Sequence, residues 1–216
     1  MENHEILIIG TVHVFDYSND LVKIFYDEKP DVICVELDKT RYKSWLSGEK
    51  IIKDRPFFIR QFSKIQKELA KKYKTVSGID MLIPIYYAQA HNIPLEFIDM
   101  DIKTIIDNYR KVSWLERAFL SYIIILVRIF LFIIGKRGFE FFYKNSSIDG
   151  KSPILFFNTF ILNERNKYMA DRLRELLKTY QKIVVCIGEQ HIPGISVILN
   201  SYDLKYRTMK IRDLKK

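Results

Sequence analysis

The stretch ILIIGTVHV, residues 6–14, begins with an apolar run that ends at Gly10. His13 follows three positions later. Near the other end of the chain, IVVCIGEQHIPGI (183–195) repeats this arrangement with Gly188 and His191. Continuous apolar runs rich in β-branched residues are typical of strands buried on both faces of a parallel sheet. The two runs therefore predict two core strands, each followed by a glycine turn that carries a histidine.

The rest of the chain alternates between short apolar runs and segments with helical periodicity. We expect strands at 5–9, 32–36, 94–98 and 183–187, with an edge strand at 204–211. We expect helices at 19–28, 39–47, 57–73, 78–91, 114–134, 154–178 and 193–200. This alternation is typical of an α/β fold, with a mostly parallel central sheet and helices on both faces.

Residues 102–153 differ from the remainder and predict a helical insertion, so that 1–101 and 154–216 together form the α/β core domain. The insertion contains SWLERAFLSYIIILVRIFLFIIGKRG, which begins with the capping-box pair Ser113 and Glu116 and ends its apolar run at Gly135. The sequence therefore predicts one long apolar helix here.

Three environments are compatible with this helix. Its apolar run, 119–134, is shorter than the roughly 20 residues that span a bilayer. Arg128 near its middle would cost about 2.5–3.5 kcal/mol on membrane-insertion scales. We expect a helix packed in a core or a homodimer interface. The first alternative is contact with a membrane surface through 114–137, and the second is a helix that spans the membrane.

Composition narrows the class of protein. A chain of 216 residues can form one well-buried domain. The net charge is +9, but the basic residues are spread out and no zinc-finger spacing accompanies them, so we expect no nucleic-acid partner.

Cys34 and Cys186 both fall in predicted strands, which favours buried thiols in a reducing compartment. MENHE leads directly into the first strand, so we expect no secretion leader and a cytoplasmic protein, peripheral at a membrane if the apolar helix binds one.

The two glycine turns point to a site at one edge of the sheet. In open α/β sheets, ligands bind at the carboxyl ends of the strands. Glycine at positions 10 and 188 suggests a positive φ or close backbone packing. If the two strands are neighbours, His13 and His191 converge; the alternative is that each histidine caps a turn or a helix start.

Acidic residues follow the other strands. Asp38 and Asp101 are suited to capping helices, whereas Glu36 at the end of an apolar strand is not and is the stronger functional candidate. Two imidazoles and one carboxylate with open positions suit Zn, Mn, Fe or Co. A divalent metal so held lowers the pKa of bound water, which makes hydrolysis of a peptide or small-molecule substrate plausible.

Three further residues complete the predicted catalytic set. Glu189, inside the second turn, is a candidate general base or additional metal ligand. Arg41 or Arg165 is a candidate for stabilising a developing oxyanion.

Five motifs occur in the order in which they occur in a known family: GTVHV, ELDKTRY, FIDMDI, LNERNKYMADRL and IGEQHIPGI. Across residues 5–200 the chain resembles the TraB/PrgY family, relatives of the TIKI proteins, in a superfamily that includes erythromycin-esterase-like and ChaN-like proteins. The resemblance implies an α/β metal-dependent hydrolase, because TIKI members are described as metalloproteases. The PrgY branch is linked to the shutdown of peptide pheromones at the membrane.

The resemblance implies roles for six residues of this chain: His13, His191, Glu36, Arg41, Glu164 and Arg165. The chain departs from the family at Met100, where an arginine is frequent, and in GEQH, where small residues are usual. Without the resemblance, the segment LNERNKYMADRL reads as an ordinary amphipathic helix whose Glu164 and Arg165 form surface pairs. With it, we expect this helix to direct one of the two into the site.

These patterns lead to two functional hypotheses. The first is a peptidase-like metallohydrolase. The second is a non-catalytic regulatory protein that binds a peptide or haem and associates with a membrane surface.

Overall fold

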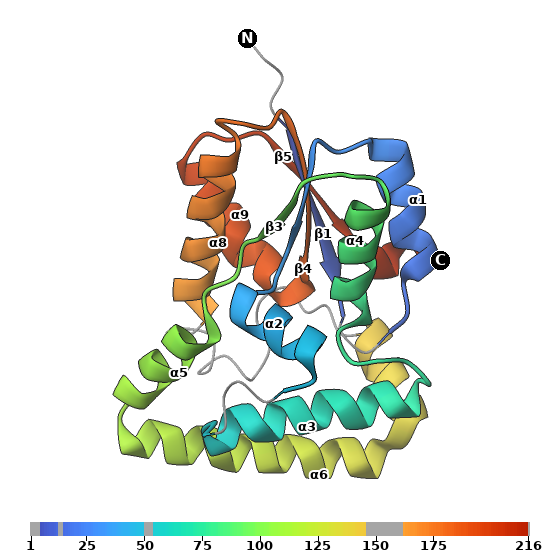
Figure 1. Ribbon diagram of the computed structural model, residues 1–216. Helices are drawn as coiled ribbons and strands as arrows, with labels where there is room; N and C mark the ends of the chain where they lie inside the picture. The colour runs from blue at the N-terminus through green and yellow to red at the C-terminus, as the bar shows by residue number, and fades with distance from the viewer. Residues whose placement is uncertain (1–4, 13–14, 50–53, 146–161, 216) are drawn as a thin grey trace.

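A five-stranded parallel sheet forms the centre of the computed structural model, which describes residues 5–12, 15–49, 54–145 and 162–215 (Figure 1). Its strands are β1 (Glu5–Thr11), β2 (Val32–Val35), β3 (Leu95–Phe97), β4 (Lys182–Gly188) and β5 (Tyr206–Lys210). They lie in the order β3-β2-β4-β1-β5, and every neighbouring pair is parallel. The predicted α/β fold with a mostly parallel sheet is confirmed.

Helices connect these strands at positions close to those predicted. They are α1 (Ser18–Glu28), α2 (Lys39–Ser47), α3 (Phe57–Lys72), α4 (Ile79–Ala90), α5 (Ile102–Lys111), α6 (Trp114–Asn145), α8 (Asn163–Leu176) and α9 (Ile192–Ser201), with short 3₁₀ turns η2 (Glu189–His191) and η3 (Ile211–Lys215). Helix α5 was not among the helices expected individually. Residues 154–161 of the expected helix 154–178 lie outside the described residues.

Side chains alternate between the two faces of the sheet, as the pleat requires. Ile6 and Ile8 of β1 pack on one face with residues of α8 and α9. Leu7 and Ile9 pack on the other face with residues of α1 and α4. All four side chains are 0–1% exposed, and burial of each contributes about 1.5–3 kcal/mol.

The two apolar runs that defined the fold are neighbours in the sheet. β1 pairs with β4, with Gly10 opposite Ile187 and Thr11 opposite Gly188. The two strands are neighbours, as the predicted site required, so the two glycine turns follow strands that end at the same edge of the sheet.

A layer of helices lies beyond the carboxyl ends of the strands (Figure 1). In it, Phe58, Ile65 and Leu69 of α3 pack with Tyr109 of α5 and with Leu120 and Ile124 of α6. The layer therefore joins α5 and α6, from the predicted insertion, to α3, from the segment assigned to the core domain. The domain boundaries at 102 and 153 stay a prediction.

Helix α6 begins and breaks where the sequence indicates. The Ser113 Oγ accepts from the Glu116 N–H at 3.3 Å, and the Ser113 N–H donates to Glu116 Oε2 at 3.2 Å, which is the predicted capping box. At Gly135 the backbone is non-helical, with φ 61° and ψ −162°, and the helix then resumes. Left-handed φ values of this kind favour glycine.

The segment Trp114–Phe139 of α6 is long and apolar enough to cross a membrane by length and composition, and only 11% of its most apolar window is buried. Leu120 and Ile124 are its buried hydrophobic residues among the described side chains. One side of α6 therefore packs against α3, while most of the window is exposed, and the choice among core or dimer interface, membrane surface and membrane span stays a prediction.

Candidate functional site

Charged and polar side chains from separate elements meet at the carboxyl ends of β2, β3 and β4. We call them the edge cluster: Glu36, Asp38, Arg41, Asp99, Arg165, Asn166 and His191. Its acids, its amide and its imidazole are each less than 10% exposed. Buried charges are stable only when they are paired and hydrogen-bonded, so the contacts of the cluster decide what it can do.

Glu36 is fixed between β2 and β4. Its backbone N–H donates to the Cys186 carbonyl at 3.0 Å. Its Oε2 accepts from the Gly188 N–H at 2.6 Å, and its Oε1 accepts from Arg165 Nη2 at 2.5 Å. The carboxylate therefore has a single orientation, set by the backbone of the second glycine turn and by one guanidinium group.

Asp99 is held between two arginines. Arg165 donates to it through both Nε, at 2.9 Å, and Nη2, at 2.8 Å, in a two-point contact. Arg41 donates to Asp99 and also to Asp38, whose carboxylate caps α2. Helix α2 is thereby anchored to the end of β3.

These contacts displace the pKa values of the groups involved. Burial alone would raise the pKa of Asp99, but the charges of Arg165 and Arg41 outweigh burial and hold that pKa below its usual range. Burial alone would lower the pKa of Arg165, but Asp99 and Glu36 raise it. Both groups are therefore ionised at neutral pH.

The His191 ring is fully buried, and one neighbour sets its tautomer. Its Nδ1 lies 2.5 Å from Asn166 Oδ1. Because an amide oxygen only accepts, Nδ1 carries the hydrogen and Nε2 of the neutral ring presents a lone pair. A Cβ at Gly194 would lie 2.1 Å from Asn166 Nδ2, so glycine at 194 allows the amide to reach the ring.

The other ring nitrogen faces a carboxylate without bonding to it. His191 Nε2 lies 3.1 Å from Glu36 Oε1, yet has no hydrogen-bond partner of acceptable geometry among the described residues. The Nε2 lone pair is therefore not directed along the line to Oε1, which leaves this buried nitrogen available to a cation beside that line.

A divalent ion fits these two atoms. Two donors bound to one ion at roughly 2.0–2.1 Å lie roughly 2.9–3.4 Å apart, which brackets the separation found here. A carboxylate oxygen has two lone pairs, so Oε1 can meet Arg165 with one and an ion with the other. The described residues contain no group of three or more His, Cys, Asp or Glu that could hold a metal. The predicted third ligand, His13, lies outside the described residues.

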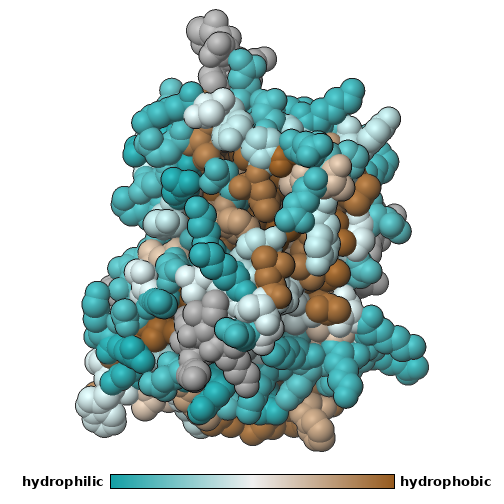
Figure 2. Space-filling view, in the orientation of Figure 1, coloured by the Kyte–Doolittle hydropathy of each residue, from teal (hydrophilic) through white to brown (hydrophobic). Residues whose placement is uncertain are grey.

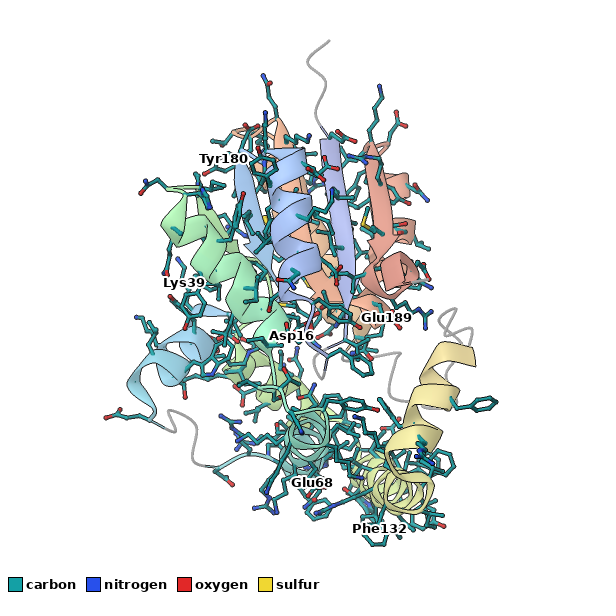
Figure 3. All side chains as sticks on the ribbon, turned by 90° about the vertical axis from the view of Figure 1, so that its right-hand side faces the viewer. Asp16, Lys39, Glu68, Phe132, Tyr180 and Glu189 are labelled. Carbon is teal, nitrogen blue, oxygen red and sulfur yellow. The ribbon has the colours of Figure 1, made fainter. Side chains whose placement is uncertain are left out.

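The structure brings together four of the predicted site residues: Glu36, Arg41, Arg165 and His191. Of the pair on α8, Arg165 points into the cluster and Glu164 does not, because its Oε2 accepts from Asn108 of α5. Glu189 lies at the same edge as the cluster (Figure 3), where its Oε2 is 3.4 Å from Arg212 Nε. Asn108 and Arg212 do not belong to the edge cluster, and the catalytic roles of Glu164 and Glu189 stay predictions.

The smaller structural predictions at this edge have clear outcomes. Asp38 and Asp101 cap α2 and α5, as expected. Gly10 is required by close packing, since a Cβ there would lie 2.5 Å from Ile192 Cδ1 and 2.9 Å from Glu189 Cβ. Of the two reasons expected for glycine, positive φ or close packing, the first does not apply at Gly188, where φ is −60°.

Two polar residues at this edge were not predicted. Asn166 lies on the buried side of α8 with Met169, Ala170 and Leu173. Asp80 is completely buried on α4, where it accepts from the Thr11 hydroxyl. In both helices, the signal in the sequence was a single polar residue on an otherwise apolar helix face.

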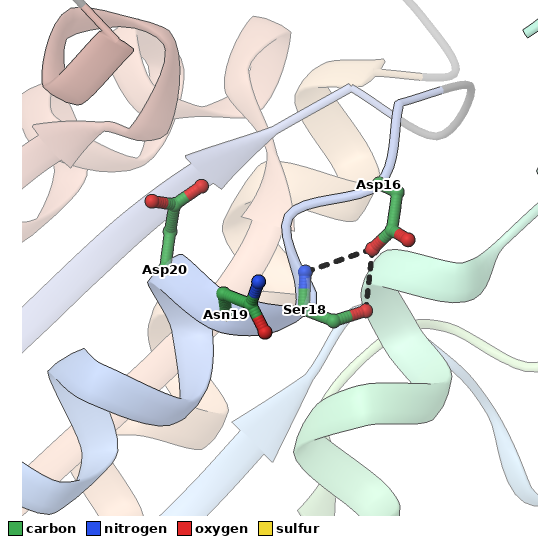
Figure 4. Close-up of a pocket in the computed structure, with 4 residues that line it drawn as sticks. All are labelled: Asp16, Ser18, Asn19 and Asp20. Carbon is green, nitrogen blue, oxygen red and sulfur yellow. Dashed lines mark hydrogen bonds between the residues drawn. The ribbon is translucent and has the colours of Figure 1, made fainter.

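A shallow hollow lies near the start of α1, on the loop that follows β1 (Figure 4). It is lined by Asp16, Ser18, Asn19 and Asp20. The Asp16 carboxylate accepts from the N–H and the hydroxyl of Ser18, which orders the helix start. None of the residues of the edge cluster lines this hollow.

Comparison with known proteins leaves the family open. No protein-family model matches the chain. The chain is 25% identical to the uncharacterized protein MJ1365 of Methanocaldococcus jannaschii over 88% of its own length and 52% of that relative. It thus spans about half the length of the curated relative it matches, and the resemblance to the TraB/PrgY family stays a prediction.

Proposed function

We propose that the protein is a metal-dependent hydrolase of the peptidase type, with its site in the edge cluster. The observation that carries this proposal is the buried His191 Nε2, which has no hydrogen-bond partner among the described residues and lies 3.1 Å from Glu36 Oε1. The ordered motifs of the TraB/PrgY resemblance support the same chemistry.

In this proposal, His191 and Glu36 hold the ion together with His13. A bound Zn, Mn, Co or Fe ion would lower the pKa of a bound water and polarise a carbonyl group. The protein itself supplies orientation. Asn166 keeps the imidazole in the tautomer that can bind a cation, and the Gly188 N–H keeps the Glu36 carboxylate turned toward the ring.

The arginines provide the positive charge that an acyl-transfer reaction requires. The Arg165 side chain is 13% exposed and that of Arg41 is 29% exposed, whereas the His191 side chain is 0% exposed. A substrate that approaches the cluster meets Arg41 first. The guanidinium groups are therefore positioned to attract a carbonyl oxygen or a carboxylate.

The alternative is a non-catalytic protein that binds a peptide or haem. The complete burial of His191 and the closed set of ion pairs around Asp99 favour this alternative, because both are also features of a purely structural network. The two proposals differ in whether a metal is bound and whether turnover depends on it.

The deciding experiment measures metal content and hydrolysis together. We expect wild-type protein loaded with Zn, Mn, Co or Fe to retain about one ion after desalting, and to cleave members of a peptide library. His13→Ala, His191→Ala and Glu36→Gln should each lower the affinity for the ion by at least tenfold, because each removes a proposed ligand.

His91→Ala is the matched control, since His91 is an exposed histidine at the end of α4 and should leave metal binding unchanged. If the wild type holds no ion in stoichiometric amount, or if His191→Ala holds as much as the wild type, the metallohydrolase is excluded. Peptide or haem binding that survives without metal or turnover would establish the alternative.

We also propose that the protein works in the cytoplasm. Cys34 and Cys186 are both free and buried, as expected of thiols in a reducing compartment.

A further inference from the structure

Exposed hydrophobic side chains form a continuous strip along α6. We call this set the α6 strip: Trp114, Leu115, Phe119, Tyr122, Ile125, Leu126, Ile129, Phe130, Phe132 and Ile133. Their exposed fractions range from 41% for Leu126 to 83% for Phe132. Figure 2 shows hydrophobic side chains along the margin where α6 lies, and Figure 3 shows Phe132 at the outer side of the helical layer.

The strip occupies a single side of the helix. At about 100° per residue, its ten members fall within an arc of about 160°. The charged residues of the same stretch, Glu116, Arg117 and Arg128, fall outside this arc, as do the buried Leu120 and Ile124. Uninterrupted apolar surface of this extent is unusual for a monomer in water and marks an interaction surface.

Contacts with α3 hold α6 parallel to its neighbour. Arg128 donates to Glu68 at 2.6 Å and to Gln61 at 3.1 Å, so the arginine is directed toward α3. The Tyr73 hydroxyl, just after α3, donates to the Lys136 carbonyl at 3.4 Å. Since α3 carries five lysines and arginines, α6 cannot cross a bilayer in this arrangement without taking those charges into it.

Basic residues are concentrated on α3, which packs against α6, and directly after the strip. Between residues 57 and 74 there are six basic side chains and one acidic side chain, Glu68, which is already paired with Arg128. Lys136 and Arg137 follow the strip directly, and both are exposed. Near an anionic membrane each such cation contributes about 1 kcal/mol of attraction.

We propose that the α6 strip binds the surface of an anionic lipid bilayer, with α6 lying in the plane of the interface. The apolar arc enters the boundary between headgroups and acyl chains, and the lysines of α3 face the phosphates. A second copy of the chain is the poorer occupant. A symmetric dimer through this strip would bring two sets of lysines together, on protomers that each carry a net charge of +9.

The test measures binding of the full-length chain to vesicles. Vesicles of phosphatidylcholine with phosphatidylglycerol are compared with vesicles of phosphatidylcholine alone by co-sedimentation at low and high salt. We expect binding to the anionic vesicles that weakens as salt is raised. In a Trp45→Phe background Trp114 is the only tryptophan, so its emission should shift to shorter wavelength on binding.

Two variants separate the apolar and the ionic contributions. Leu126→Asn with Ile129→Asn and Ile133→Asn should lower partitioning at least tenfold. Lys64→Gln with Lys67→Gln and Lys71→Gln should remove the preference for anionic vesicles.

Each variant has a control of equal chemistry elsewhere on the surface. For the first, the control is Val22→Asn with Tyr26→Asn and Val197→Asn, which changes exposed hydrophobic residues of α1 and α9. For the second, it is Lys167→Gln with Lys178→Gln and Lys205→Gln. Both controls should partition like the wild type, and circular dichroism verifies that every variant is folded.

Three results would overturn the proposal. The first is no binding of wild type to anionic vesicles, and the second is equal partitioning of the wild type and a folded strip variant. The third is a wild-type dimer that the strip variant dissociates while vesicles bind neither, which would assign the strip to a second copy.

Discussion

Arg165 is the residue on which the edge cluster most depends. It contacts Glu36 through one nitrogen and Asp99 through two, and its own side chain is only 13% exposed. Removing one partner of a buried ion pair leaves the other charge without compensation. Replacing Arg165 therefore lowers the free energy of unfolding by leaving two buried carboxylates without a paired charge.

We expect Arg165→Met to lower the free energy of unfolding by about 3–5 kcal/mol, because Glu36 and Asp99 lose their common cation. Urea denaturation followed by circular dichroism measures the change. Arg172→Met is the control on the same helix, where the arginine is 40% exposed and pairs with Glu96, and it should cost less than about 1 kcal/mol. Equal effects of the two changes would contradict this account of the cluster.

Asp99 makes stability depend on pH. A carboxyl group whose pKa is lower in the folded state adds stability above its unfolded pKa and loses it as the pH falls through the folded value. We expect the free energy of unfolding of the wild type to fall as the pH drops below about 4, near the unfolded pKa of aspartate. Asp99→Asn should be less stable at neutral pH and should show a shallower fall in acid.

The measurement is urea denaturation at a series of pH values. Asp203→Asn is the control, because Asp203 is exposed with a left-handed φ of 55° that asparagine also adopts. Its acid profile should coincide with that of the wild type, and an Asp99→Asn profile that also coincides would exclude this role for Asp99.

At this scale the sequence predicted the location of residues that follow directly from the end of a strand. Glu36 and His191 follow β2 and β4, and both lie in the cluster. Asn166 was missed because its role depends on the facing helix α9, where Gly194 makes room for it. Which of Glu164 and Arg165 turns inward likewise depends on how α8 packs, and not on the motif itself.

At the scale of elements, β1 packs closely against the second glycine turn beside the site. Gly10 lies in β1, and Glu189 and Ile192 approach it so closely that no side chain fits between them. This contact fixes the position of the second glycine turn relative to the end of β1. The position of His191, two residues after Glu189, follows from it.

We expect Gly10→Ala to lower the free energy of unfolding by about 1–3 kcal/mol, as overpacking in a rigid core does. Adding Ile192→Val removes the Cδ1 atom that lies 2.5 Å from the new methyl group, so the double variant should recover part of the loss. Thermal and urea denaturation of the two variants and of Ile192→Val alone provide the comparison. If Ile192→Val makes Gly10→Ala no more stable, the strain does not arise at this contact.

Prediction of the elements succeeded where local signals are strong. Four of the strands follow from apolar runs bounded by turn residues, β5 was expected as an edge strand, and the break in α6 follows from Gly135. Helix α5 was missed although Ile102, Ile105, Ile106 and Tyr109 have helical spacing, because its ten residues were read only as part of a larger insertion. The exposure of α6 depends on the absence of a covering partner in the described structure, which apolar spacing does not reveal.

At the scale of the whole molecule, the sheet unites two cores. Cys34 belongs to the core on the side of α8 and α9, and Cys186 belongs to the core on the side of α1 and α4. Both thiols are fully buried, and burial raises the pKa of each well above its usual value. Burial and a raised pKa both disfavour the reactive thiolate form of each cysteine.

We expect both cysteines to be protected from a disulfide reagent in native protein and to react at the same rate when urea is added. The reason is that neither face can open without disrupting the strands they share. The single-cysteine variants Cys34→Ala and Cys186→Ala, followed by the release of thiolate at mildly alkaline pH, give the two rates separately. Clearly different rates would show that one face opens independently.

The fold class and the parallel sheet were predictable because strand and helix signals alternate along most of the chain. The association of α3 with α6 was not, since it joins segments about sixty residues apart through apolar contacts that other pairs of helices could equally have made. Tertiary pairing of this kind is decided by the shape of whole faces, whereas the sheet is already indicated by single runs.

The place of β1 between β4 and β5 has a consequence for biogenesis. β2 can pair with β3 once residue 97 has left the ribosome, but both neighbours of β1 come from residues 182–210. β1 therefore stays unpaired until residues 182–210 have been synthesised. Completion of the sheet is slow, because it closes a very long loop. In the nascent chain, residues 6–9 are the segment that a holding chaperone would shield.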